Sequence, residues 1–298
     1  MGVKEIQKRE AVTTIALVFI ALFFVGLMSV IFKVDSPKYD IDEINKGGDW
    51  KQVTDEIFIS KGSYVSVNMV LVVSKGEVAL IDTGANKTEG LRVKEYIEDN
   101  NLIVNKIFLT HKHSDHIANL SMFEVSRENI YDFANTTDNQ IIKMGDRSFK
   151  ILYTPGHSND NHISIELIED KILVAGDVVP TCAAPLISYG GDSITLKKTL
   201  ERIKKSKYSL IIPGHGNLFE TKRTVEIQLE YLKKARALVK ELILSGKSVQ
   251  DAKKIKLIEC VDGTTGFTSI AQAEHRNTIS KLYYEVKAEI KKAKEEKD

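Results

Sequence analysis

The stretch LTHKHSDHIANL, residues 109–120, decides how this chain is interpreted, because it gathers four side chains of metal-ligating type within six positions. These are His111, His113, Asp115 and His116. The stretch follows KIFLT, a run typical of a strand. If the chain stays extended there, His111 and His113 project to the same side about 6.6 Å apart and can bind one ion. Asp115 and His116 turn elsewhere, at the start of a helix predicted over IANLSMFE, where they can face a second ion.

Three more side chains of the same type occur where predicted strands end. His157 lies in TPGHS after ILY, Asp177 in AGDV after KILV, and His215 in PGHG after SLII. Glycines beside them permit tight turns and a close approach of the backbone. Clustered imidazoles and carboxylates are costly unless a cation compensates them, so these residues together predict a metal site at one edge of a sheet.

The pattern of apolar residues predicts an α/β fold made of two similar halves. Strands are expected in SYVSVNMVLVVS, EVALID, KIFLT, SFKILYT, HISIELI, KILVAG and SLIIP, and helices over 87–100 and 193–205. Two such halves indicate sheets stacked face to face with helices outside, a four-layer architecture over residues 54–220. Residues 221–298 are expected to form a helical C-terminal extension, with helices over 221–245 and 269–294.

These motifs, with Asp82 in LIDTG, resemble in order the five motifs of the metallo-β-lactamase superfamily. The resemblance covers roughly residues 55 to 216 and implies an αββα sandwich. It implies that one metal is held by His111, His113 and His157, that a second is held by Asp115, His116 and His215, and that Asp177 bridges both. Asp82 matches an acid of the family, and its expected task is to accept a hydrogen bond from a ligand imidazole.

Imidazole and carboxylate ligands without thiolate favour two zinc ions, with iron or manganese as other possible occupants. Such a pair would make the chain a hydrolase in which Asp115 both ligates and orients the nucleophile. Class B β-lactamases carry Cys where Asp177 stands, so the pattern is more similar to the glyoxalase II, lactonase and small phosphodiesterase branches. An ester, thioester, lactone or phosphodiester is therefore the expected small-molecule substrate. A β-lactam hydrolase, a non-catalytic member and an iron redox protein stay as alternatives.

Other residues leave their roles open at this point. Tyr189 or Ser188, in the segment after Asp177, could contact the substrate, or the segment could be a plain connecting loop. His162 could contact the substrate, support a metal ligand, or simply begin a strand. The lysine-rich run KKTLERIKKSKY, residues 197–208, fits either an anionic membrane surface or a solvated helix face. The two cysteines, Cys182 and Cys260, are expected to be unpaired and buried, and a bridge between them stays an alternative.

Residues 11–32 contain no charge, proline, asparagine or glutamine, and their number matches the roughly 20 residues that a transmembrane helix needs. We expect a short arm (1–10), one membrane-spanning helix (11–32) and a polar linker (33–53). Basic residues flank both sides, so the positive-inside rule does not decide the orientation. The short arm favours a catalytic domain outside the cytoplasm. With 42 basic and 41 acidic residues, the chain has no excess of positive charge that would attract nucleic acid, so nucleic acid is an unlikely partner. The sequence does not indicate the oligomeric state.

Overall fold

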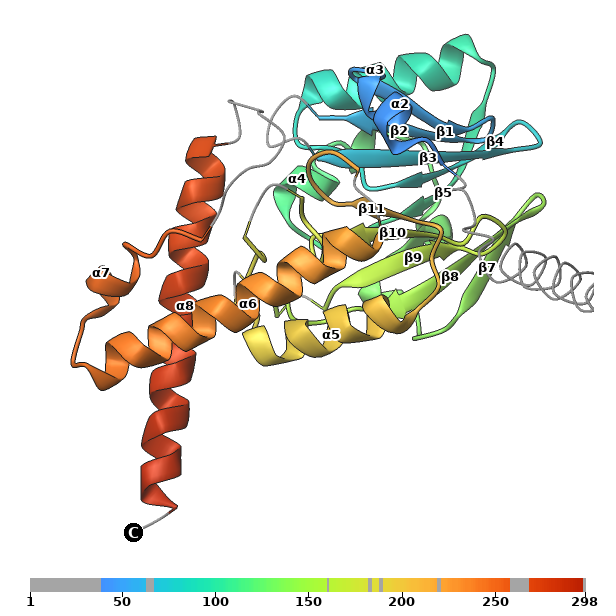
Figure 1. Cartoon of the computed structure of the whole chain (residues 1–298). Coiled ribbons are helices and arrows are strands. Elements are labelled where there is room, and N and C mark those ends of the chain that lie inside the picture. The colour runs from blue at the N-terminus through green and yellow to red at the C-terminus, as the bar shows by residue number, and fades with distance from the viewer. Residues whose placement is uncertain are drawn as a thin grey trace, which may run out of the picture. The chain divides into compact units, whose positions relative to one another are not determined.

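Two mixed β-sheets face each other in the computed structural model, and helices cover their outer faces (Figure 1). The structure describes residues 39–62, 67–159, 161–181, 184–187, 190–218, 221–257 and 268–296. The first sheet has the order β1 (Trp50–Thr54), β2 (Ile57–Lys61), β3 (Asn68–Ser74), β4 (Glu77–Ile81), β5 (Ile103–Phe108) and β6 (Ile130–Tyr131). The second has the order β11 (Leu210–Pro213), β10 (Ile172–Gly176), β9 (Ile163–Leu167), β8 (Arg147–Tyr153) and β7 (Ile141–Met144).

The core between the sheets is built from rows of apolar side chains that run across the strands. In the first sheet, Ile81 pairs with both Val70 and Phe108. In the second, Ile172 pairs with Leu167 and Leu210. All of these side chains are buried in one cluster, because residues paired across strands point to the same face. The two sheets are held together by burial of this apolar surface.

The outer face of the first sheet is covered by α3 (Lys87–Asp99). Val93 and Ile97 of this helix pack on Leu71, Leu80 and Ile107. Asn86 caps the N-terminus of the helix, and its side chain accepts a hydrogen bond from the backbone N–H of Glu89. Both faces of β3 and β4 are therefore buried, which explains their nearly continuous apolar sequences.

Three helices cover the outer face of the second sheet: α5 (Ser193–Lys205), α6 (Thr221–Leu244) and α8 (Thr268–Glu295). Leu196 and Leu200 of α5 contribute to this layer, with Leu232 of α6 and Leu282 of α8. In Figure 1, α8 crosses α6. A short α7 (Val249–Ala252) lies between them in the chain. The α/β fold with two sheets and C-terminal helices is thus confirmed.

Several elements differ from the sequence-based expectation. Residues 41–53 were expected to be linker, but they form α2 (Ile41–Lys46) and most of β1, whose Val53 joins the inner core. The helix expected over IANLSMFE is only a single turn, α4 (Ser114–Ile117), followed by a 3₁₀ turn (Leu120–Met122). Two further 3₁₀ turns, Arg127–Asn129 and Phe133–Asn135, flank β6.

The predicted membrane helix, residues 11–32, lies outside the described residues. Among the residues that the structure does describe, no helix is both long and apolar enough to span a bilayer.

Candidate metal centre

The side chains predicted to bind metal meet at one edge of the two sheets, where five strands end. Strands β4 and β5 are parallel, so the residues that follow them, Asp82 and His111, emerge at the same edge. Strands β8, β10 and β11 run in one direction in the second sheet. The segments after them carry His157, Asp177 and His215. The topology therefore gathers residues that are far apart in sequence.

The gathered side chains form two adjacent clusters. His111, His113, His157 and Asp177 make the first, and Asp115, His116 and His215 make the second. His111 and His113 follow the strand, as expected, and lie in the irregular segment between β5 and α4. Their ring centroids are 4.4 Å apart.

Asp177 lies between the two clusters and offers one oxygen to each. Its Oδ1 lies 3.2 Å from Nε2 of His116 and 3.1 Å from Nε2 of His215. Its Oδ2 lies 3.7 Å from Nε2 of His111 and 3.6 Å from Nε2 of His157. This is the arrangement of a carboxylate that bridges two cations.

Several imidazoles are held so that one ring nitrogen faces the clusters. His157 presents Nδ1 to the backbone carbonyl of Leu186 at 2.9 Å, and His116 presents Nδ1 to Oδ2 of Asp82 at 2.7 Å. A carbonyl and a carboxylate can only accept, so in both neutral rings the proton sits on Nδ1 and the lone pair of Nε2 points into the site.

Asp82 orients ligands of both clusters. Besides His116, its carboxylate accepts hydrogen bonds from the backbone N–H and the hydroxyl of Thr110, each at 2.8 Å. The Thr110 oxygen in turn lies 3.0 Å from Nδ1 of His111. Because that hydroxyl donates to Asp82, it accepts from His111, and Nε2 of His111 is left facing Asp177.

Backbone strain accompanies this role of Asp82. Its φ is 60°, in the left-handed region that residues other than glycine seldom adopt. Its backbone N–H donates to the carbonyl of Phe108 at 2.9 Å, and its side chain is buried. The position directs a buried carboxylate toward His116 and toward Thr110, which contacts His111, and such strain is concentrated at functional sites.

Burial and neighbouring charges shift the pKa values of the site in opposite directions. Burial lowers the pKa of His157 to about 4, and burial together with the charge of His116 holds the pKa of His111 well below its usual range. Burial would also lower the pKa of His116 and His215, but the negative charge of Asp177 raises both. For Asp177, burial would raise the pKa, but the charges of His215 and His116 lower it well below its usual range.

The seven residues fit cations on geometric grounds. Nδ1 of His113 lies 3.2 Å from Nε2 of His157, and Nε2 of His116 lies 3.3 Å from Nε2 of His215. Zinc–nitrogen bonds of about 2.0–2.1 Å at tetrahedral angles would separate neighbouring nitrogens by about 3.3–3.4 Å. Nε2 of His111 is buried with no hydrogen-bond partner among the described residues. A cation on these atoms removes the cost of burying them together.

His162 does not lie where a substrate could touch it, as the sequence had allowed. Its side chain is fully buried, and its Nε2 accepts the backbone N–H of Asp177 at 3.1 Å. Its Nδ1 therefore carries the proton and donates to the Thr154 hydroxyl at 2.8 Å. His162 thus positions the residue that links the clusters. Tyr189 and Ser188 lie outside the described residues, as do Cys182 and Cys260.

Three residues that the sequence did not indicate support or face the site. Thr110 connects Asp82 to His111, as described above. Asn68 donates from its side chain to the carbonyls of Pro213 and Gly216 at 2.9 and 3.0 Å, which fixes the turn that carries His215. Glu274 of α8 has a pKa raised by burial and by the negative charges of Asp177 and Asp115. Glu274 is thus electrostatically coupled to the two carboxylates of the clusters.

A model of the Metallo-beta-lactamase superfamily matches residues 63–129 and 124–215, which together span 153 of the chain's 298 residues. The chain belongs to this superfamily. The matched segment contains all seven residues of the two clusters and Asp82.

Curated relatives within the superfamily are distant. A hydroxyacylglutathione hydrolase of Francisella tularensis subsp. novicida is 32% identical over 28% of this chain and 38% of its own length. The acyl-coenzyme A thioesterase MBLAC2 of Gallus gallus is 28% identical over 33% of this chain and 36% of its own length. The thioesterase pkgB of Emericella nidulans is 28% identical over 50% of this chain and 46% of its own length. The chain spans less than half the length of these relatives.

Solved structures share the fold. A metallo-β-lactamase family protein from Thermus thermophilus superposes with a TM-score of 0.57 at 16% identity, over 78% of this chain and 93% of that protein. A metallo-β-lactamase from Pontibacter korlensis superposes with a TM-score of 0.53 at 19% identity, over 62% of this chain and 98% of that protein. At these identities the likeness establishes the fold alone.

Proposed function

We propose that this chain is a dinuclear zinc hydrolase of thioesters. The position of Asp177 between two histidine clusters carries the proposal, because one oxygen of its carboxylate faces each cluster. Two of the distant relatives are named thioesterases, and the third is named a hydroxyacylglutathione hydrolase. The ligand set contains nitrogen and oxygen but no thiolate, which suits zinc and leaves iron or manganese as competitors in a metal analysis.

The chain's own residues would hold two ions and prepare the site for a nucleophile. His111, His113 and His157 would hold one ion, Asp115, His116 and His215 the other, and Asp177 would bridge them. When bound, the ions would supply Lewis acidity and lower the pKa of a bound water toward neutrality. The protein's own side chains would orient the metal ligands and position the attacking water.

Asp82 and Thr110 keep the Nε2 atoms of His116 and His111 directed at the ions, and His162 fixes the backbone of Asp177. Asp115 is the most exposed carboxylate of the clusters, with 27% of its side chain accessible, whereas 3% of Asp177 is accessible. Asp115 is therefore placed to orient an attacking water and to accept its proton. Helix α8, with Glu274, would border the space that the acyl group enters.

The test is a hydrolysis screen of the zinc-loaded full chain in neutral detergent. Its substrates are a glutathione thioester, an acyl-coenzyme A, a lactone, a phosphodiester and a β-lactam. We expect turnover of a thioester that is lost on chelation and restored by zinc. His113→Ala should be inactive and bind less zinc, whereas Lys198→Gln, on the exposed face of α5, should resemble the parent chain. Thioester turnover that persists in metal-free protein would overturn the proposal.

We also propose that residues 11–32 anchor the chain in a membrane as a single pass, with the catalytic domain outside the cytoplasm. The length and uniformly apolar character of this segment support the anchor. Fractionation and protease treatment of intact cells test both parts. The domain should remain with membranes after alkaline washing, and external protease should degrade it.

A further inference from the structure

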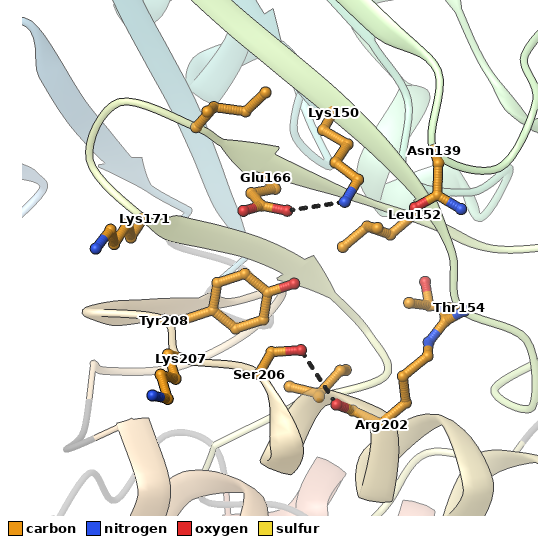
Figure 2. Close-up of a pocket in the computed structure, with 12 residues that line it drawn as sticks. Asn139, Lys150, Leu152, Thr154, Glu166, Lys171, Arg202, Ser206, Lys207 and Tyr208 are labelled. Atoms are coloured by element: carbon orange, nitrogen blue, oxygen red, sulfur yellow. Dashed lines mark hydrogen bonds and ion pairs between the residues drawn. The ribbon is translucent and has the colours of Figure 1, made fainter.

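A second cavity, separate from the metal centre, lies on the outer side of the second sheet. It has a volume of about 600 Å³, is open to solvent on one side, and lies between β8, β9 and the C-terminal end of α5 with the segment that follows it (Figure 2). None of its lining residues belongs to the two metal clusters. A volume of this order accommodates an organic molecule of moderate size rather than a few waters.

The charged residues that line this cavity, which we call the basic pocket, are mostly cations. They are Lys150, Lys171, Arg202 and Lys207, with Glu166 as the single acid. Lys150 lies opposite Glu166 on neighbouring strands, with Nζ 3.8 Å from the carboxylate. The five side chains leave three positive charges in excess.

The excess charge is only weakly compensated by residues around the pocket. One guanidinium nitrogen of Arg202 lies 3.9 Å from Asp138, a pair with both side chains more than a third exposed. Arg202 also donates to the backbone carbonyl of Tyr153. Lys171 and Lys207 have no acidic partner within the described part of the chain. Cations that share a concave surface without counter-charges attract anions.

The remaining walls of the basic pocket suit an uncharged body attached to an anionic group. Leu152, Ile168 and Ile203 give it an apolar lining. The Tyr208 ring stands beside Glu166 in Figure 2, and burial, with the charge of Glu166, raises the pKa of this phenol. Tyr208 therefore stays neutral, so that it offers an aromatic surface and a hydroxyl donor.

We propose that the basic pocket binds an organic phosphate ester, with its phosphate at Lys171 and Lys207. These two lysines lie on one side of the Tyr208 ring in Figure 2, and Arg202 lies on the other side, beside Thr154. Guanidinium and ammonium groups are the usual protein partners of phosphate oxygens. The ester's uncharged part would lie on Leu152 and Tyr208. The proposal assigns a role to part of the lysine-rich run 197–208, because Arg202, Ser206 and Lys207 come from it. The phosphate can belong to a soluble nucleotide or to a lipid headgroup, and these sources share the same chemistry.

Calorimetric titration of the full chain in neutral detergent tests the proposal with three probes: inorganic phosphate, adenosine 5′-monophosphate and dihexanoyl phosphatidic acid. The pocket variant is Lys171→Gln/Lys207→Gln. The matched control is Lys198→Gln/Lys205→Gln, which removes the same charge from exposed lysines of α5 that do not line the pocket. Thioester or other test-substrate turnover, which neither variant should change, checks that both fold.

At least one ester should bind more tightly than inorganic phosphate, and the pocket variant should bind it at least about tenfold more weakly. The control should differ from the parent by less than about twofold, since diffuse surface charge is screened by salt. Tighter binding of the nucleotide identifies a soluble ligand, and tighter binding of the phosphatidic acid identifies a lipid. The proposal is overturned if no probe binds, if both double variants weaken binding equally, or if inorganic phosphate binds as tightly as both esters.

Discussion

Replacing Asp82 with asparagine should weaken the binding of both metal ions, although Asp82 is not a member of either cluster. The carboxylate accepts three hydrogen bonds, from the N–H and hydroxyl of Thr110 and from Nδ1 of His116. If the new amide keeps its oxygen on the Thr110 N–H, its NH₂ group must face the Nδ1–H of His116 and the Thr110 hydroxyl. Donors then oppose donors, and the rings of His116 and His111 lose their orientation.

The size of the effect follows from the bonds that are lost. A hydrogen bond to a charged acceptor contributes about 1.5–3 kcal/mol, which corresponds to about 10- to 150-fold in an equilibrium constant. Loss of groups that orient metal-binding histidines is of the same order, about 10- to 100-fold in metal affinity. We therefore expect each zinc dissociation constant of Asp82→Asn to rise by about one to two powers of ten.

Competition of metal-free protein with a chromophoric chelator measures both constants, and mass spectrometry of digested protein measures the metal content after dialysis. Asp170→Asn is the control, because it removes a carboxylate paired with Arg147 at the opposite end of β10 from the site. It should lower stability without changing zinc affinity. If folded Asp82→Asn held both ions as tightly as the parent chain, the orienting role of Asp82 would be wrong.

Three other expectations concern separate parts of the site. His162→Ala leaves the buried backbone N–H of Asp177 without its acceptor and should cost about 1–3 kcal/mol of folding free energy, measured by chemical denaturation, together with reduced zinc retention. Acidification should release zinc from the cluster of His116 and His215 first. Because Asp177 raises their pKa values, these two rings take up protons at a higher pH than His157, whose pKa is about 4, and protons compete with zinc for Nε2. Stepwise dialysis with metal analysis follows the order, and simultaneous loss of both ions would contradict it. Glu274→Gln should change KM for anionic thioesters by several-fold with unchanged zinc content, since it removes a carboxyl group near Asp177 and Asp115; equal kinetics would place Glu274 outside the substrate's path.

Much of the fold could be predicted because its strands are buried on both faces. The runs that form β3, β4, β10 and β11 are almost continuously apolar. This pattern can be recognised in the sequence without knowing which elements cover the strands. Residues 50–61 were harder to assign, because apolar and polar side chains are mixed in β1 and β2. Their place at the edge of the first sheet comes from pairing with β3, which is a long-range interaction.

Some polar residues of the metal centre could likewise be predicted from the sequence, and others could not. His111, His113, Asp115 and His116 stand out because their spacing is improbable without a cation. No sequence pattern distinguishes Thr110 and Asn68, because a threonine after a strand and an asparagine at the start of another are common in any sequence. Only the folded chain places their side chains on Asp82 and on the turn that carries His215.

By itself, the sequence of this chain determined which residues can bind metal and which segments form buried strands, since side-chain chemistry and apolar periodicity are local properties. The tertiary structure decided that one oxygen of Asp177 faces each cluster, and that Asp82 contacts His116 directly and His111 only through Thr110. It also decided that His162 is a buried support rather than a substrate contact, and that four cations line a cavity on the outer side of the second sheet. Those facts depend on distances between residues that lie far apart along the chain, and such distances exist only after the two sheets pack together.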